Sequence, residues 1–244
     1  TDGSSVSDMS TPDEDWSLFR AYTSMANAES GVENTGLNDI IENFDTWTGG
    51  HDLTLGNNTW NIAMYADEVE NIGGSTVVFD GWTTGITNKL RVFSPSKLTE
   101  VGVSQRHQAY MSNQGYRIIS VGNSTIASNI SYIDFEGLQL TMHNATKSDY
   151  TAPFSLNIEN GASNPASVTL KDNIVEVKLG ETPTYSNYGI SLNNDNIVNP
   201  HIVFNVFNNI IFYSGYGTST TLYPAHGIRL YQGTAYVYHN TSVN

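Results

Sequence analysis

The residues best suited to chemistry lie in the second half of the chain: two acids, Glu159 and Asp195, an arginine, Arg229, and a tyrosine, Tyr231. Two carboxylates held close together could bind a divalent cation such as Ca²⁺. A tyrosine ring could stack on a sugar ring. These residues are far apart in the sequence, so joint chemistry requires elements that bring them to one surface.

A repeated turn pattern indicates such elements. Three stretches share the order apolar, any, apolar, two turn-prone positions, Asn and a β-branched residue: 168–174, 204–210 and 235–241. Their asparagines, Asn173, Asn209 and Asn240, are spaced by 36 and then 31 residues. Self-similarity with a period in the thirties is typical of stacked units.

A second series of apolar–polar–apolar stretches alternates with the turns, at 119–121, 154–156, 190–192 and 228–230. These stretches are separated by 35, 36 and 38 residues, so each period contains at least two short strands. Stacking successive coils would place equivalent strands side by side in parallel, ~4.8 Å apart. The sequence therefore predicts an all-β solenoid of coils of ~35 residues, a parallel β-helix.

The stack makes definite predictions about side chains. We expect Asn173, Asn209 and Asn240 to form a ladder, because the Asn amide has both a donor and an acceptor and tolerates left-handed backbone. Residues 133–138 are the earliest member of this series, with Gly137 where the later ones have Asn. Two inward columns follow from the second series: Ile119 over Phe154, Ile190 and Ile228, and Val121 over Leu156, Leu192 and Leu230.

Three outward columns follow as well: Ser120, Ser155, Ser191 and Arg229; Gly122, Asn157, Asn193 and Tyr231; and Glu159 and Asp195, opposite Gly233. The candidate catalytic residues on this face are Arg229, Asp195 and Glu159. The candidate glycan-binding residues are Tyr231, Asn193 and Asn157. Two stacked carboxylates on a polar surface are also typical of a merely solvated face, so both interpretations stay open.

The N-terminal part is less regular. Residues 1–31 are predicted to be a loose tail and a helix that begins at a Thr11 capping box and ends near Glu29–Gly31, covering the open first layer. Residues 32–115 should form irregular coils, and 116–244 regular ones. Arg106 and His107 lie in a polar loop, 95–115, that is either functional or a plain connection. Short strands are expected at 40–41, 60–64, 76–79 and 90–93.

Composition excludes several classes of function. The net charge of −14 argues against nucleic acid and anionic membrane partners. The chain has no cysteine, hence no disulfide framework and no thiolate metal site. No apolar run reaches ~18 residues, so we expect no membrane insertion. No signal peptide is recognisable, which suits either a mature form or a protein that never had one. Absence of cysteine with abundant Asn, Ser and Thr is typical of exported bacterial or viral proteins.

On these turn repeats, the sequence from about residue 116 onward resembles the right-handed parallel β-helix superfamily, the pectate-lyase-like fold. Four earlier stretches look like first coils of secreted or phage-associated members: 80–84, 90–92, 115–117 and 132–138. The resemblance implies a right-handed winding. It leaves activity open, because this superfamily contains lyases, hydrolases, epimerases, phage tailspikes, adhesins and structural proteins.

Two enzyme activities can be compared with the residues. A lyase would need Ca²⁺ on clustered carboxylates and a basic residue such as Arg229 to take a proton. A polygalacturonase-like hydrolase would need paired aspartates, and residues 193–195 and 225–229 depart from its motifs. His226 and His239 are instead expected in turns.

The leading hypothesis is a non-enzymatic structural β-helix outside the cell or on a virion surface. The last coil, which contains Asn240, would present an open edge, so either the chain continues or another subunit covers that edge. We therefore expect self-association as an oligomer, filament or surface layer, with possible glycan contact. The alternative is an enzyme that degrades an acidic polysaccharide. No cofactor is expected, although Ca²⁺ remains possible.

Overall fold

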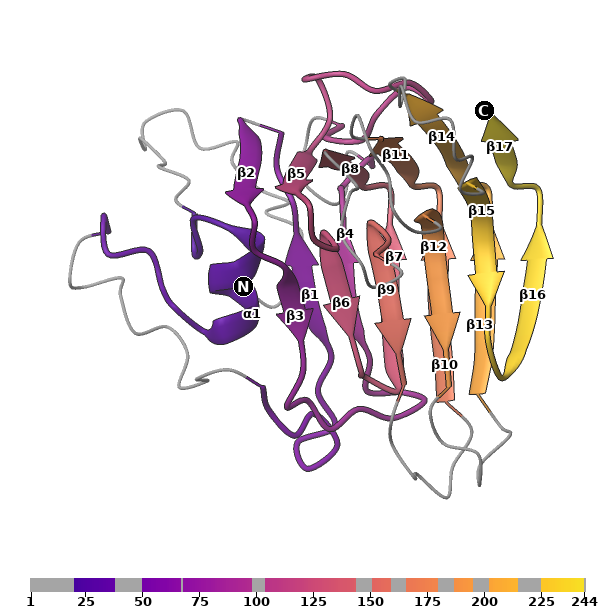
Figure 1. The fold of residues 1–244 in the computed structure, drawn as a ribbon. Coiled ribbons are helices and arrows are strands. Elements are labelled where there is room, and N and C mark those ends of the chain that lie inside the picture. Colours follow the sequence, from indigo (N-terminus) through magenta and orange to yellow (C-terminus); the bar gives the residue numbers. More distant parts are fainter. Residues whose placement is uncertain are drawn as a thin grey trace.

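The computed structural model describes residues 20–37, 50–66, 68–97, 104–143, 151–158, 166–179, 187–194, 202–214 and 225–243. These residues contain 17 strands and one short helix, α1. The strands form three parallel sheets. Figure 1 shows the strands of each sheet side by side along the stack, from the indigo N-terminal end to the yellow C-terminal end. The prediction of an all-β fold built from parallel sheets is confirmed.

Each sheet takes every third strand of the chain. Sheet 1 contains β1 (Trp60–Ala63), β4 (Leu90–Phe93), β7 (Tyr132–Glu136), β10 (Ala166–Lys171), β13 (Ile202–Phe207) and β16 (Thr234–Tyr238). Sheet 2 contains β2 (Val69–Gly73), β5 (Arg117–Val121), β8 (Gln139–His143), β11 (Ile174–Lys178), β14 (Ile210–Ser214) and β17 (Thr241–Val243). Sheet 3 contains β3 (Val77–Phe79), β6 (Ile126–Ser128), β9 (Phe154–Asn157), β12 (Asn187–Asn193) and β15 (Ala225–Leu230). One coil therefore holds three strands.

The core runs along the inside of the stack because alternate residues of each strand face it. In β10 and β13, buried and half-buried positions alternate without exception. Phe79, Phe135 and Phe154 are fully buried, with neighbouring ring centroids 5.5 and 5.4 Å apart. Aromatic rings at such distances add to the stabilisation that burial of their area provides.

The turn from sheet 1 to sheet 2 is alike in successive coils. Asn173 Nδ2 donates to Asn209 Oδ1 at 2.9 Å, and Asn209 Nδ2 donates to Asn240 Oδ1 at 2.9 Å. The same oxygens accept backbone N–H groups of the preceding coil, from Asn173 at 3.1 Å and from Asn209 at 2.9 Å. The side chains of Asn173 and Asn209 are buried, so these bonds satisfy groups that water does not reach.

The residue with left-handed backbone in this turn is the one before the asparagine. The prediction that the asparagine itself takes this conformation is therefore wrong. Positive φ values occur at Gly137, Asp172, Asn208 and His239. Gly137 therefore matches Asp172, and Leu138 takes the asparagine position. The Leu138 N–H still donates to Asn173 Oδ1, at 3.0 Å, so the backbone hydrogen bond of this turn to the next coil is kept, while the side-chain amide bond is lost.

The first members of the predicted inward columns are also wrong. Residues 119–121 belong to β5 in sheet 2, whereas Phe154 pairs with Ile126 and Leu156 with Ser128 in sheet 3. On β5 the buried residues are Ile118 and Ser120. The strand that belongs in the column, β6, has Ser128 where an apolar residue was expected, so its pattern is hidden in the sequence.

The helix is much shorter than predicted. It spans Met25–Ser30, and the hydroxyl of Ser24 accepts a hydrogen bond from the Asn27 N–H at its N-terminus. Residues 20–24 are not helical, and the predicted start at Thr11 lies outside the described residues. The expected end is confirmed, because Gly31 closes the helix with φ 71°. Met25 and Ala28 are buried, and α1 contacts β3.

Of the early strands, 60–64, 76–79 and 90–93 correspond to β1, β3 and β4, while 40–41 lies outside the described residues. Strand β2 was not predicted, because its two polar residues, Glu70 and Asn71, are adjacent and break the alternation of apolar and polar residues that marks a strand. Among the described helices, none is both long and apolar enough to cross a membrane.

The asparagine turn makes a direct prediction. Asn209→Ala should lower the free energy of unfolding by ~1–3 kcal/mol, because it leaves buried partners of the amide unsatisfied. Asn205→Ala is the matched control, since Asn205 faces outward and donates to the Ser167 hydroxyl at 3.2 Å. Urea unfolding of both variants measures the difference. Equal stability of the two variants would contradict a structural role for the buried amide.

Candidate functional site

The outer face of sheet 3 gathers most of the described candidate residues. Ser155, Ser191 and Arg229 are aligned on β9, β12 and β15, and Asn157 is aligned with Asn193. Tyr231 follows β15, and its N–H donates to the Leu192 carbonyl oxygen at 2.9 Å. Tyr231 thus continues the row of Asn157 and Asn193. Because strands are ~4.8 Å apart, five strands make a strip roughly 20 Å long.

The N-terminal end of this strip is hollowed. A shallow groove of about 190 Å³ is lined by Val78, Ala127, Ser128, Asn129, Ser155 and Asn157. Ala127 and Asn129 occupy the places predicted for Ser120 and Gly122, because β6 and not β5 belongs to this sheet. The prediction of Ser120 and Gly122 on this face is therefore wrong, and Ser120 is buried.

Arg229 lies between two tyrosine rings at the C-terminal end of the strip. Its guanidinium carbon is 5.0 Å from the ring centre of Tyr188 and 5.2 Å from that of Tyr231. A guanidinium over an aromatic face is held by cation–π attraction. Tyr188 also stacks on His226, with ring centres 5.2 Å apart. The result is a cationic group framed by aromatic rings, one of them, Tyr231, 60% exposed.

Tyr188 and His226 were not predicted to belong to this site. They occupy equal places in two short matching stretches, 188–190 and 226–228, in which Tyr or His is followed by Gly and Ile. The glycine is required because a Cβ on Gly189 would lie 2.3 Å from the Ile211 side chain. His226 therefore lies on β15 and not in a turn, whereas His239 is in a turn with φ 53°.

The two candidate acids, Glu159 and Asp195, lie outside the described residues. Within the described ranges, no group of three His, Cys, Asp or Glu side chains is placed to hold a metal ion. The described part of the site thus offers hydrogen-bonding side chains, aromatic rings and one cation. Such a surface suits a ligand with hydroxyl and carboxylate groups.

Loop residues Arg106 and His107 are tied to the turn between sheets 1 and 2. Arg106 contacts Glu136 at 2.6 Å and Asp172 at 3.4 Å, and its Nε donates to the Ser94 carbonyl oxygen at 3.3 Å. His107 Nε2 lies 2.7 Å from the Asp172 carbonyl oxygen. These contacts favour a structural connection over a functional loop.

No protein-family model, no curated protein and no solved structure matches the chain. Support for the candidate site therefore comes from its geometry alone.

The loop contacts predict a pH dependence of stability. Burial raises the pKa of Glu136, but hydrogen bonds from Arg106, Arg91 and Lys171 outweigh it and lower this pKa to about 2. A folded-state pKa below the unfolded one stabilises the fold above pH ~4.5, and the gain is lost as the pH falls towards 2. Glu136→Gln should therefore cost about 2–3 kcal/mol at pH 7 and much less at pH 3.

Thermal or urea unfolding at the two pH values measures this difference. Asp134→Asn is the matched control, because Asp134 is the other outward acid of β7 and contacts one lysine, Lys89, at 3.5 Å. We expect a smaller deficit for the control at pH 7. A Glu136→Gln deficit that is the same at pH 7 and pH 3 would contradict the assignment.

Proposed function

We propose that the protein is a structural β-helix that self-associates through its last described coil and contacts glycans through the outer face of sheet 3. The observation that carries this proposal is the exposure of core positions on that coil. Leu230 is 42% exposed, whereas its neighbour Leu192 one coil below is fully buried. Val237 is 49% exposed, whereas Val206 below it is fully buried.

The backbone of this coil supports the same proposal. Strands β15, β16 and β17 each lie at the end of their sheet, so one side of each strand has no paired neighbour among the described strands. Exposed apolar side chains beside an open strand edge are a template for pairing with another strand. A second copy of the chain would supply both the strand and the apolar cover.

The opposite end of the stack favours a closed pair of copies over a filament. We infer that the coils wind right-handed, as parallel crossover connections almost always do, and that α1 caps the first coil. The Met25 N–H donates to both carboxylate oxygens of Glu70 on β2, at 3.2 Å, and Trp82 Nε1 donates to Glu29 at 3.3 Å. A head-to-tail stack would have to break these contacts, whereas two C-terminal edges can meet directly.

The outer face of sheet 3 favours glycan contact. Tyr231 can stack on a sugar ring, Asn193 can bond hydroxyls, and Arg229 can pair with a carboxylate. A polysaccharide lying across the strands would follow the roughly 20 Å strip. We propose that the protein lies outside the cell or on a virion surface, because glycans are found there. A cysteine-free chain rich in Asn, Ser and Thr is also typical of exported bacterial or viral proteins.

Self-association is tested by light scattering after size-exclusion chromatography and by negative-stain microscopy. The wild type should be a dimer at about 100 µM. Val237→Asp and Leu230→Asp should give monomers, because a carboxylate would be buried in the contact. Ile86→Asp is the control, an apolar residue that is 72% exposed and lies between β3 and β4, at the other end of the stack.

A monomeric wild type, or a Val237→Asp variant that associates as the wild type does, would overturn the proposal. All variants change exposed side chains, so melting temperatures close to that of the wild type verify that the fold is intact.

The alternative, a polysaccharide-degrading enzyme, is favoured by the placement of Arg229 between Tyr188 and Tyr231. The test is incubation with acidic polysaccharides, with and without Ca²⁺, followed by absorbance of unsaturated products and by reducing ends. The structural proposal expects no product. A product that disappears in Arg229→Ala and is restored in part by Arg229→Lys would favour the enzyme instead.

A further inference from the structure

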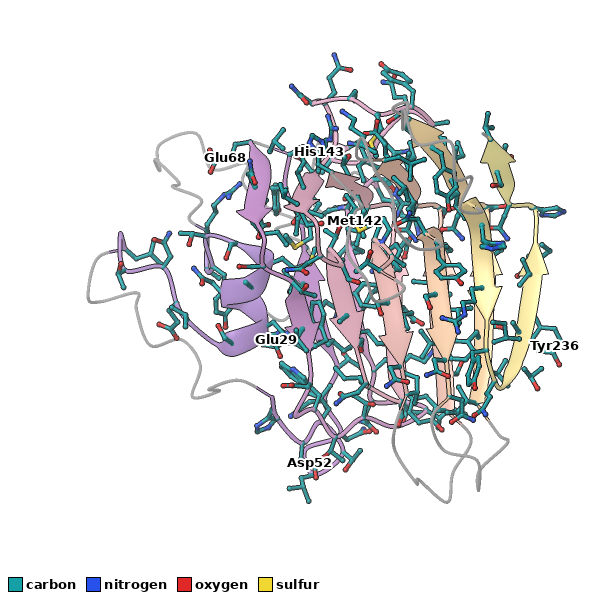
Figure 2. All side chains as sticks on the ribbon, in the orientation of Figure 1. Glu29, Asp52, Glu68, Met142, His143 and Tyr236 are labelled. Carbon is teal, nitrogen blue, oxygen red and sulfur yellow. The ribbon has the colours of Figure 1, made fainter. Side chains whose placement is uncertain are left out.

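The outer face of sheet 2 carries a charged cluster that the repeat does not require. Its members lie on four adjacent strands: Arg117 on β5, Thr141 and His143 on β8, Glu176 and Lys178 on β11, and Ser214 on β14. We call this set the sheet 2 cluster. Thr141 and Glu176 are aligned in neighbouring strands. Two residues further along the same strands, His143 and Lys178 come side by side, and Figure 2 labels His143 at the upper edge of the stack.

Glu176 is the centre of the cluster and is already well bonded. Its Oε2 accepts from Thr141 at 3.1 Å and from Arg117 at 3.4 Å. Its Oε1 accepts from the Ser214 hydroxyl at 2.8 Å. Its side chain is 8% exposed, so these bonds compensate for the removal of a carboxylate from water.

Two nitrogen groups at the edge of the cluster have donor capacity left over. Lys178 Nζ is 3.7 Å from Glu176 Oε1, beyond hydrogen-bond distance, and its side chain is 40% exposed. His143 Nε2 is buried, and no group in the described part of the chain forms a hydrogen bond with it. The histidine ring as a whole is half-buried, and rotation about its Cβ–Cγ bond, a soft torsion, can turn a nitrogen towards Lys178 and the solvent.

The charge of the cluster is opposite to that of the protein. Arg117 and Lys178 provide two cations against the one carboxylate of Glu176, in a chain with a net charge of −14. The excess positive charge favours an anion and disfavours a metal ion. Burial, Lys178 and Arg117 lower the pKa of His143, and Glu176 opposes this change. The free protein therefore keeps this histidine neutral near pH 7.

We propose that His143 and Lys178, with Arg117 behind them, bind an oxyanion: a carboxylate or a sulfate group. The lysine ammonium and a histidine N–H would each donate to one oxygen of the ligand, and charge-assisted bonds of this kind are the stronger ones. This site is separate from the sheet 3 face and does not depend on self-association. The proposed oxyanion site would give the stack a second face, the outer face of sheet 2, that binds acidic groups.

The test uses acetate as the carboxylate probe and sulfate as the sulfate probe, with chloride at equal ionic strength as the reference. Histidine ring signals are followed by long-range ¹H–¹⁵N NMR on the full chain and assigned with His143→Gln. We expect saturable shifts of the His143 signals in the millimolar range for at least one probe. The pKa of His143 should rise in the bound state, so affinity should fall as the pH rises through that pKa.

Lys178→Met should weaken the binding roughly tenfold, because it removes one charge-assisted bond. Lys89→Met is the matched control, a lysine of similar exposure that contacts Asp134 on sheet 1. Saturation by acetate alone assigns the site to carboxylates, and saturation by sulfate alone assigns it to sulfates. The proposal is overturned if neither probe shifts His143 more than chloride does, or if Lys178→Met titrates like the wild type.

Discussion

The structure depends on one hydrogen-bonding arrangement, the side-chain amide in the turn between sheets 1 and 2. The oxygen of Asn209 accepts both the amide and the backbone N–H of Asn173 in the coil below, and Asn240 does the same for Asn209. These bonds favour a single stacking register for the coils from β7 to β17. This matters because a slip by one residue would turn every inward side chain of a strand to the outside.

The fixed register gives each sheet an outer face with its own chemistry. On sheet 1, Glu136 anchors the loop that carries Arg106. On sheet 2, Glu176 organises the cluster from which we infer an oxyanion site. On sheet 3, Arg229 lies between tyrosine rings at one end of a shallow strip. On such a scaffold the outward residues are the ones that can contact a ligand. The inward phenylalanines form the core that holds the outward residues in position.

Sequence patterns predicted the fold wherever the turn was marked by asparagine. Val168 and Phe204, and likewise Leu170 and Val206, are aligned as their repeat indicates. The sequence pattern failed where residues of another type occupy the asparagine position of the turn or an inward position of a strand. Leu138 fills the asparagine position through its backbone N–H, and Ser128 fills an inward apolar position. The sequence pattern therefore assigns β5 to sheet 3, where the structure has β6.

The candidate sites were predictable only in part. Arg229 lies on β15 and Tyr231 follows the end of that strand two residues later, so their joint orientation follows from strand geometry. Tyr188, whose ring contacts Arg229, comes from the neighbouring coil. It precedes Gly189, where close packing excludes a side chain, and the simple alternation of a strand does not predict its direction. The sheet 2 cluster joins four strands diagonally, from Arg117 to Ser214, and no local spacing in the sequence indicates it.

The central claim is that asparagine turns hold the coils in register, and native-state hydrogen exchange tests it most directly. The backbone amides of Leu138, Asn173 and Asn209 each donate to an asparagine side-chain oxygen. They should exchange as slowly as core strand amides, only when the whole stack unfolds. Exchange at the rate of exposed turn residues such as Leu55 would contradict the account.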